Sequence, residues 1–423
     1  MNKERINIAE PIDRVEESIY RVEEQREESV ALDKRLVLIM AIACALSVAN
    51  LYYIQPLLAI MGQEFAVSAN QMGFIATMGQ IGYACGLLFI IPLGDKYNQR
   101  KLIVGMLIAV TLALVFMASA PSIILITVAS FLVGVATVVP QLIIPYAASL
   151  ASARERGQVV GTVMSGLLIG ILLARTISGL VAAHSGWRAM YWIAAAMMVV
   201  LAILMRFLLP RDKAKKGDMS YPRLLSSLWG LVREEPVLRE VMLFGAMAFA
   251  AFSAFWVALS FFLATPPYHF GSEVAGLFGL VGVAGALAAS FVGKFADRRD
   301  PRVANGLALV IVLLAFVCMW LTGQWLFGLI IGTILLDLGT QANQISSQAR
   351  IYSMRPEARN RLNTVYMFFY FVGGSLGSLL GTLGWSLARW NGVCAVASLM
   401  LLIALGFYAL NTRKMRMYLQ SRT

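Results

Sequence analysis

The stretch Ile91-Pro-Leu-Gly-Asp-Lys-Tyr-Asn-Gln-Arg-Lys101 is a charged turn between two apolar segments. A turn of the same kind, Gly293-Lys-Phe-Ala-Asp-Arg-Arg-Asp-Pro-Arg302, returns later in the chain and again separates two apolar segments. Asp297 of the second turn follows Asp95 of the first by 202 positions. This recurrence at matched places predicts a chain built from two related halves.

The composition predicts a membrane protein with many spans. Of the 423 residues, 59% are hydrophobic and only 14% are charged, whereas an ordinary soluble domain has about 25% charged residues. The first 35 residues hold ten acidic and seven basic groups, so the remainder of this chain of net charge +12 is about fifteen positive. An ordinary soluble globular protein is therefore excluded.

Twelve apolar segments are long enough to cross a bilayer, which takes about 20 helical residues for a core about 30 Å thick. We place these segments at residues 36–61, 71–93, 101–119, 123–150, 158–182, 188–209, 240–265, 272–292, 303–321, 325–351, 362–387 and 391–410. The expected fold is an all-α membrane protein with twelve transmembrane helices in two six-helix, pseudo-symmetric halves.

The chain divides at its one long break between spans. We expect a cytoplasmic N-terminal segment (1–35), a first six-helix half (36–209), a cytoplasmic linker (210–239), a second six-helix half (240–410) and a cytoplasmic tail (411–423). Within the linker an apolar stripe predicts an interfacial helix on the inner leaflet. The stripe consists of Leu224, Leu225, Leu228, Trp229 and Leu231.

The positions of the basic residues predict the orientation, because loops rich in Lys and Arg stay in the cytoplasm. Apart from Arg175, which falls inside a span, only Arg188 and Arg389 fall on the loops of the other side. Both termini are therefore expected in the cytoplasm, and the whole chain in a bacterial inner membrane. The acidic N-terminus does not have the pattern of a secretory signal.

The residue types that enzymes need are poorly represented. The two histidines, His184 and His269, fall on expected external loops, and no phosphate-binding loop, metal-ligand spacing or pair of catalytic carboxylates stands out. The four cysteines lie in apolar runs and are interpreted as packing residues. We expect no enzymatic activity, no cofactor, no metal and no nucleic-acid partner.

Two ionisable residues fall deep inside expected spans, Asp337 and Arg175. Each would cost about 2.5–3.5 kcal/mol at the centre of a helix that faces lipid, so both should face the protein interior. Asp337 begins a polar stripe at helical spacing that continues through Gln341, Gln344 and Gln348, with Thr340 and Asn343 beside it. The stripe either lines water or substrate, or packs against another helix through hydrogen bonds.

Arg175 has three possible partners. It lies in a span with Gly166, Gly170 and Gly179, which predict a face for close helix packing. Its depth differs from that of Asp337 by about 7 Å, which a long side chain can cover. The sequence leaves open an ion pair with Asp337, hydrogen bonds to backbone carbonyls, or contact with substrate.

The two charged turns resemble the signature loop of the major facilitator superfamily, Gly-x-x-x-Asp-Arg/Lys-x-Gly-Arg/Lys-Arg/Lys. The matching residues are Asp95, Lys96, Arg100 and Lys101 in the first turn and Gly293, Asp297, Arg298 and Arg302 in the second. The first turn departs at Ile91 and Asn98, and the second at Asp300 and Pro301. In the resemblance, the turns form a conformational latch that consists of Asp95, Arg100, Asp297 and Arg298.

The resemblance also implies a central cavity lined by helices 1, 4, 7 and 10. The candidate substrate-binding residues on these helices are Asn50, Tyr53, Gln55, Gln141, Phe252, Trp256, Gln341 and Gln344. These amide and aromatic groups fit a neutral, amphipathic or cationic compound better than a polyanion. For any one aromatic residue, ordinary core packing remains the alternative.

The function we expect is secondary active transport by alternating access, with proton-coupled efflux of a small organic compound by a monomer in the lipid bilayer. Asp337 would carry the proton, with Arg175 beside it, because an acid in a low-dielectric interior holds its proton more readily. Ile171 and Ser130 stand where related drug exporters have proline and arginine. A proton-coupled metabolite importer is therefore an alternative, and a membrane receptor or facilitative channel is another.

Overall fold

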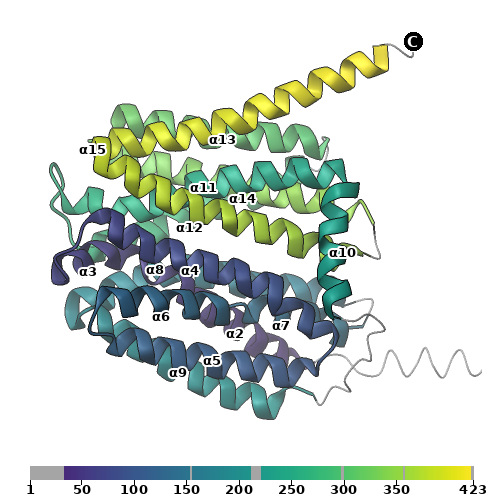
Figure 1. Cartoon of the computed structure of the whole chain (residues 1–423), viewed down its shortest axis with the longest axis horizontal. Helices are drawn as coiled ribbons and strands as arrows, with labels where there is room; N and C mark the ends of the chain where they lie inside the picture. The colour runs from purple at the N-terminus through teal and green to yellow at the C-terminus, as the bar shows by residue number, and fades with distance from the viewer. Residues whose placement is uncertain (1–32, 153–154, 211–220, 297–299, 356–357, 421–423) are drawn as a thin grey trace, which may run out of the picture.

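The computed structural model describes residues 33–152, 155–210, 221–296, 300–355 and 358–420, of which Asp95, 286–296 and 413–420 are described by their backbone alone. The described chain is helical (Figure 1). Its elements are α2 (Lys34–Tyr52), η1 (Gln55–Leu57), α3 (Leu58–Glu64), α4 (Ala69–Phe89), η2 (Ile91–Asp95), α5 (Gln99–Ser119), α6 (Ile123–Ala136), α7 (Val139–Leu150), α8 (Arg156–Ser185), α9 (Trp187–Leu208), α10 (Tyr221–Glu234), α11 (Pro236–Ala264), α12 (Ser272–Ala296), α13 (Pro301–Thr322), α14 (Leu326–Tyr352) and α15 (Arg359–Gln420).

The lengths of these helices fit twelve crossings of a bilayer. Ten stretches of the described chain are long and apolar enough to span a membrane, and one of them, Arg359–Thr412, has 54 residues. Such a helix is about 80 Å long, far more than a core of about 30 Å needs. It bends sharply at Ala388 and Arg389, which have non-helical backbone angles. With this bend and the 25-residue α12, the structure is consistent with the expected all-α, twelve-helix membrane fold.

The first and the fourth expected spans are interrupted next to a proline. The first span changes from α2 to the short η1 at Gln55–Leu57, and the fourth changes from α6 to α7 after Thr137. Pro56 and Pro140 lack the N–H that would continue the helical hydrogen bonds. Each break lies beside a residue that we predict to bind substrate, Gln55 in the first span and Gln141 in the fourth.

The helices form two groups, α2–α9 and α11–α15, joined by α10 (Figure 1). We call the end of the bundle at which α10 lies the linker end, and the opposite end, where α4 begins, the far end. The predicted linker helix is present as α10, in which Leu228 and Leu231 are buried while Trp229 is 56% exposed. The Tyr221 hydroxyl of α10 donates to Phe89 O at 2.8 Å, and Arg361 of α15 donates to the Ser227 hydroxyl at 3.3 Å.

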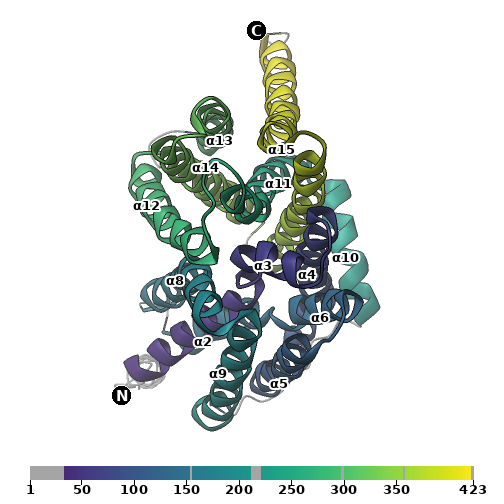
Figure 2. The ribbon, with the colours of Figure 1, turned by 90° about the vertical axis from the view of Figure 1, so that its left-hand side faces the viewer.

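The two groups meet along two seams, α4 with α15 and α8 with α12, which are visible from the far end in Figure 2. In the first seam Asn70 Nδ2 donates to Ser386 Oγ at 3.1 Å, and Gln80 Nε2 donates to Ser378 Oγ at 2.9 Å. In the second, Thr176 Oγ1 donates to Gly276 O at 2.9 Å. At the far end, α3 also packs on α11. These seams hold the two halves together over the far end of the bundle.

Candidate functional site

Arg175 of α8 is fully buried among residues from the first half and from α11. Its Nε donates to Gln55 Oε1 at 2.6 Å, and Nη1 is 3.5 Å from Ile171 O. The Trp256 ring lies across the guanidinium, with its centroid 3.9 Å from Cζ, and the rings of Tyr52 and Phe252 lie at 4.9 and 5.6 Å. Aromatic faces of this kind attract a cation and hold the planar group in place.

Asp337 of α14 approaches the same region from the second half and is 1% exposed. Its carboxylate packs on Gly282 of α12, where an added Cβ would lie 3.1 Å from Oδ2. One turn away on α12, a Cβ on Gly279 would lie 3.1 Å from Arg175 Cβ and 2.8 Å from Leu172 O. Both charged residues thus pack on α12, at glycines three positions apart that leave room for them.

The charges of Arg175 and Asp337 interact electrostatically, and Tyr370 of α15 also interacts with Asp337. One polar atom of each charged group still has no hydrogen-bond partner among the described residues, namely Arg175 Nη2 and Asp337 Oδ2. A buried charged atom without a partner is costly, because it has lost its water and gained no hydrogen bond. Trp256 Nε1 and Thr340 Oγ1 nearby also lack a partner in the described chain, but they are neutral, whereas these two atoms belong to charged groups.

A small hollow lies beside Arg175. It has a volume of about 10 Å³, about the space of one water molecule, and is lined by Leu51, Tyr52, Ile54, Gln55, Ala76, Gln80, Phe249 and Phe371. Gln55 and Tyr52 thus face both the hollow and Arg175. Gln80 also joins the halves, through Ser253 and Ser378, at the middle of the seam. The sequence prediction missed Gln80, although an amide inside an otherwise apolar span was a signal for it.

The predicted substrate-binding residues occupy three kinds of place. Gln55, Phe252 and Trp256 surround Arg175. Gln341 and Gln344 are half-buried on α14, and Gln141 donates to the Tyr83 hydroxyl at 3.5 Å. Asn50 and Tyr53 are buried, and Asn50 Nδ2 donates to Met198 Sδ at 3.4 Å, which directs its amide toward α9 of its own half.

The polar residues of α14 divide between two environments. Thr340 lies three residues after Asp337 and its hydroxyl has no partner in the described chain. Asn343 instead packs inside the second half, where its Nδ2 donates to Phe244 O at 3.2 Å and its side chain accepts from Asn305 at 2.9 Å. For Asn343 the structure therefore shows the packing alternative.

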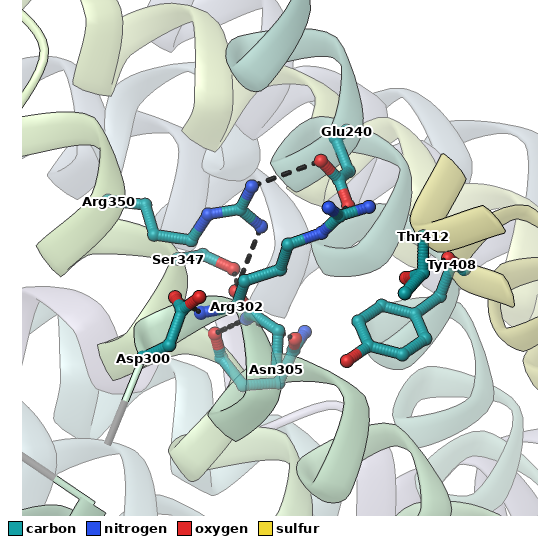
Figure 3. Close-up of polar contacts among 9 residues, drawn as sticks. Glu240, Asp300, Arg302, Asn305, Ser347, Arg350, Tyr408 and Thr412 are labelled. Carbon is teal, nitrogen blue, oxygen red and sulfur yellow. Dashed lines mark hydrogen bonds and ion pairs between the residues drawn. The ribbon is translucent and has the colours of Figure 1, made fainter. Parts of the chain in front are cut away.

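A second ionic cluster lies at the linker end and was not expected from the sequence (Figure 3). Glu240 at the start of α11 pairs with Arg302 of α13 and Arg350 of α14, each at 3.0 Å. These three side chains are only 9–11% exposed. Arg350 also donates to Asn305 Oδ1 at 3.3 Å. The cluster ties three helices of the second half into one unit.

Replacing Glu240 with glutamine is expected to lower the free energy of unfolding by about 3–5 kcal/mol, because two arginines would remain buried without their counter-charge. Unfolding of the purified protein in mixed detergent micelles measures the loss. The matched control is Glu234→Gln, which removes an acid that is 59% exposed and pairs with Arg355; such surface pairs contribute little. An equal stability of both variants would contradict the role given to the cluster.

The residues of the predicted latch are only partly described. Asp95 ends η2, and its side chain is not described, while Asp297 and Arg298 lie outside the described residues. Arg100 is buried at the start of α5 and donates to Arg206 O near the end of α9. In this conformation Arg100 therefore binds the carbonyl end of a helix, where a cation is favoured by the helix dipole.

Comparison with known proteins matches the whole described bundle. The family model described as Major Facilitator Superfamily matches residues 40–328 and 272–419. A protein of Escherichia coli O157:H7 called uncharacterized transporter YgaY is 42% identical over 374 residues, which are 88% of this chain and 95% of that protein. The inner membrane transport protein YnfM of Escherichia coli K12 is 23% identical over 376 residues, 88% of this chain and 89% of its own.

Two solved structures share the fold. The nucleoside transporter NupG superposes with a TM-score of 0.74 at 14% identity, over 89% of this chain and 99% of its own. A bacterial homologue of the human lysosomal transporter Spinster, in an inward-facing and unoccupied conformation, superposes with a TM-score of 0.72 at 16% identity, over 90% of this chain and 96% of its own.

Proposed function

The chain belongs to the Major Facilitator Superfamily and is a multi-pass membrane transporter, not an enzyme, and from this premise we propose that it exports a small organic compound in exchange for protons. The proposed exporter works by alternating access as a monomer in a bacterial inner membrane, with both termini in the cytoplasm. In this orientation the linker end faces the cytoplasm. The seams at the far end then close the site toward the outside, and the proposed next movement separates the halves at the linker end.

One observation supports the proton as the coupling ion. Asp337 is a buried acid in the second half, and its partner in charge, Arg175, belongs to the first half. When Asp337 is ionised, attraction across the halves favours their contact; when Asp337 is protonated, that attraction is lost. A single proton thus changes the energy of the contact that has to break and re-form in each transport cycle.

The other proposed parts follow from this arrangement. Gln55, Phe252 and Trp256 would contact the compound near Arg175, and Gln341 and Gln344 from α14, with Asn50, Tyr53 and Gln141 contributing once the halves move. The charged turns at Asp95 with Arg100 and at Asp297 with Arg298 would hold the linker end closed in the outward-facing state. In an importer the same parts would carry proton and compound in one direction. Import remains the alternative function because Ile171 stands where related exporters have a proline.

Counterflow tests whether the protein is a carrier. We expect proteoliposomes preloaded with unlabelled compound to take up the labelled compound several times faster than empty ones, because a loaded carrier returns its site to the outside sooner. A panel of small organic compounds is first screened through altered growth of an overexpressing strain. If preloading accelerates the uptake of none of the compounds that cross the membrane, the protein is a channel and alternating access is refuted.

A further inference from the structure

The two unpartnered charged atoms of the central site point to the chemistry of the compound. Arg175 Nη2 carries hydrogen-bond donors of a cation, and Asp337 Oδ2 is an acceptor of an anion. They belong to opposite halves, and both residues pack on α12, Arg175 against Gly279 and Asp337 against Gly282. The site thus offers a donor from a cation and an acceptor from an anion, on residues that pack three positions apart along one helix.

We infer, on the basis of the proposed transport function, that this site binds a small zwitterion of the α-amino acid type, with its carboxylate on Arg175 and its ammonium on Asp337. Such a ligand satisfies both unpartnered atoms at once with charge-assisted hydrogen bonds. The hollow lined by Tyr52, Gln55 and Phe249 lies beside Arg175, and the ligand's side chain extends into this region once the halves separate. The site is covered in this conformation and becomes accessible when the halves separate.

The balance of charge distinguishes a zwitterion from other ligands. Arg175 and Asp337 together carry no net charge when both are ionised, so a neutral zwitterion leaves the buried site neutral. A simple carboxylate would add one uncompensated negative charge, and a simple amine one positive charge, and an uncompensated buried charge is strongly unfavourable. The ligand's ammonium also needs the ionised form of Asp337, so the zwitterion and the proton compete for one carboxylate, as exchange transport requires.

Equilibrium binding of three compounds with one ring in common tests this inference. The probes are L-phenylalanine, 3-phenylpropionate, which lacks the ammonium, and 2-phenylethylamine, which lacks the carboxylate. L-alanine is a second zwitterion that needs less room. For purified wild-type protein in lipid nanodiscs, we expect at least one of the two amino acids to bind. The analogue that has the same side chain but lacks either the ammonium or the carboxylate should bind about 10-fold or more weakly than that amino acid.

Two variants are expected to change which of the three phenyl compounds binds most tightly. In Arg175→Gln the site keeps only its acid, so 2-phenylethylamine should bind better than L-phenylalanine. In Asp337→Asn the site keeps only its cation, so 3-phenylpropionate should bind better than L-phenylalanine. Arg188→Gln is the control, because Arg188 is 37% exposed and pairs with Glu64, and it should leave the order of the three affinities unchanged.

Several results would overturn the inference: no binding of either amino acid, equal binding of a singly charged analogue by the wild type, or an order of affinities that neither variant changes. These measurements use no ion gradient and are separate from the transport test. Zwitterion binding without counterflow would refute the proposed carrier function alone. Counterflow of another compound without zwitterion binding would refute this inference alone.

Discussion

Replacing Asp337 with asparagine is expected to abolish accumulation driven by a proton gradient, while counterflow stays measurable once the concentration of the compound is raised to offset its weaker binding. Asparagine keeps the size and polarity of the side chain but cannot take up and release a proton. A gradient of one pH unit is worth about 1.36 kcal/mol per proton. If one proton exchanges for one neutral molecule, the wild type should therefore accumulate its compound about tenfold, and the variant should reach only equal concentrations on both sides.

The measurement compares the two modes of transport in the same vesicles. Counterflow shows that the variant folds and moves its halves, and accumulation shows whether protons drive it; the compound is one that the wild type carries in counterflow. Glu234→Gln is the matched control, since this acid is 59% exposed at the linker end. Accumulation that survives in Asp337→Asn at the wild-type level would show that another group carries the proton.

The groups that surround Asp337 sharpen this prediction. Arg175 of α8 and Tyr370 of α15 interact electrostatically with its carboxylate, and the face of α12 toward it presents Gly282 and Gly285. Arginine stays protonated throughout the accessible pH range, and an ordinary tyrosine titrates near pH 10. Asp337 is therefore the group in this arrangement that we expect to exchange a proton in each cycle.

The membrane fold was predictable because it depends mainly on the lengths of apolar runs. The predicted segments 101–119 and 325–351 correspond to α5 at Gln99–Ser119 and α14 at Leu326–Tyr352. The boundary between the last two predicted spans falls at the bend of α15 at Ala388 and Arg389. The breaks beside Pro56 and Pro140 were not predicted, because hydropathy alone does not distinguish a continuous helix from one that a proline interrupts.

The charged centre was predictable for a different reason. A charge in the middle of an apolar span is costly in lipid, so Asp337 and Arg175 stood out as interior residues. The residues that surround Asp337 and Arg175 were not predictable in this way, because the approach of α12 through Gly279 and Gly282 depends on which helices become neighbours. A row of glycines along a helix predicts close packing but does not identify the helix that packs there.

The cluster around Glu240 was missed because its members lie at helix ends. Charged residues at such places usually face water or lipid headgroups, so Glu240 and Arg350 carried no signal, and Arg302 stood out only as part of the second charged turn. Tertiary packing buries them together. For the same reason the sequence did not separate Asn343, which hydrogen-bonds inside the second half, from Thr340, whose hydroxyl has no partner in the described chain.

The second large effect is expected at the far end. There the Asn70 amide donates to the Ser386 hydroxyl at 3.1 Å, which joins the first turn of α4 to α15 just before its bend. Alternating access requires this contact to separate in each cycle, so that the central site opens to the other side. Cysteines at both positions, joined by a short bifunctional thiosulfonate reagent, should therefore stop transport almost completely.

The chain needs a suitable background for this experiment. Its four cysteines are free, with Cys44 and Cys394 buried and Cys85 and Cys318 partly buried. Replacing all four with alanine or serine prevents unwanted cross-links, and this background is expected to remain active because we predict that the four cysteines are packing residues. The single variants Asn70→Cys and Ser386→Cys, treated with the same reagent, show whether modification without a cross-link affects transport.

Counterflow through the cross-linked double variant is the measurement that tests the alternating movement of the halves most directly. Mass spectrometry establishes how much of the protein carries the link, and the rate is then measured before and after reduction. The rocking mechanism predicts that counterflow falls in proportion to the linked fraction and returns when the reductant cleaves the link. Counterflow at the full rate through fully linked protein would contradict it.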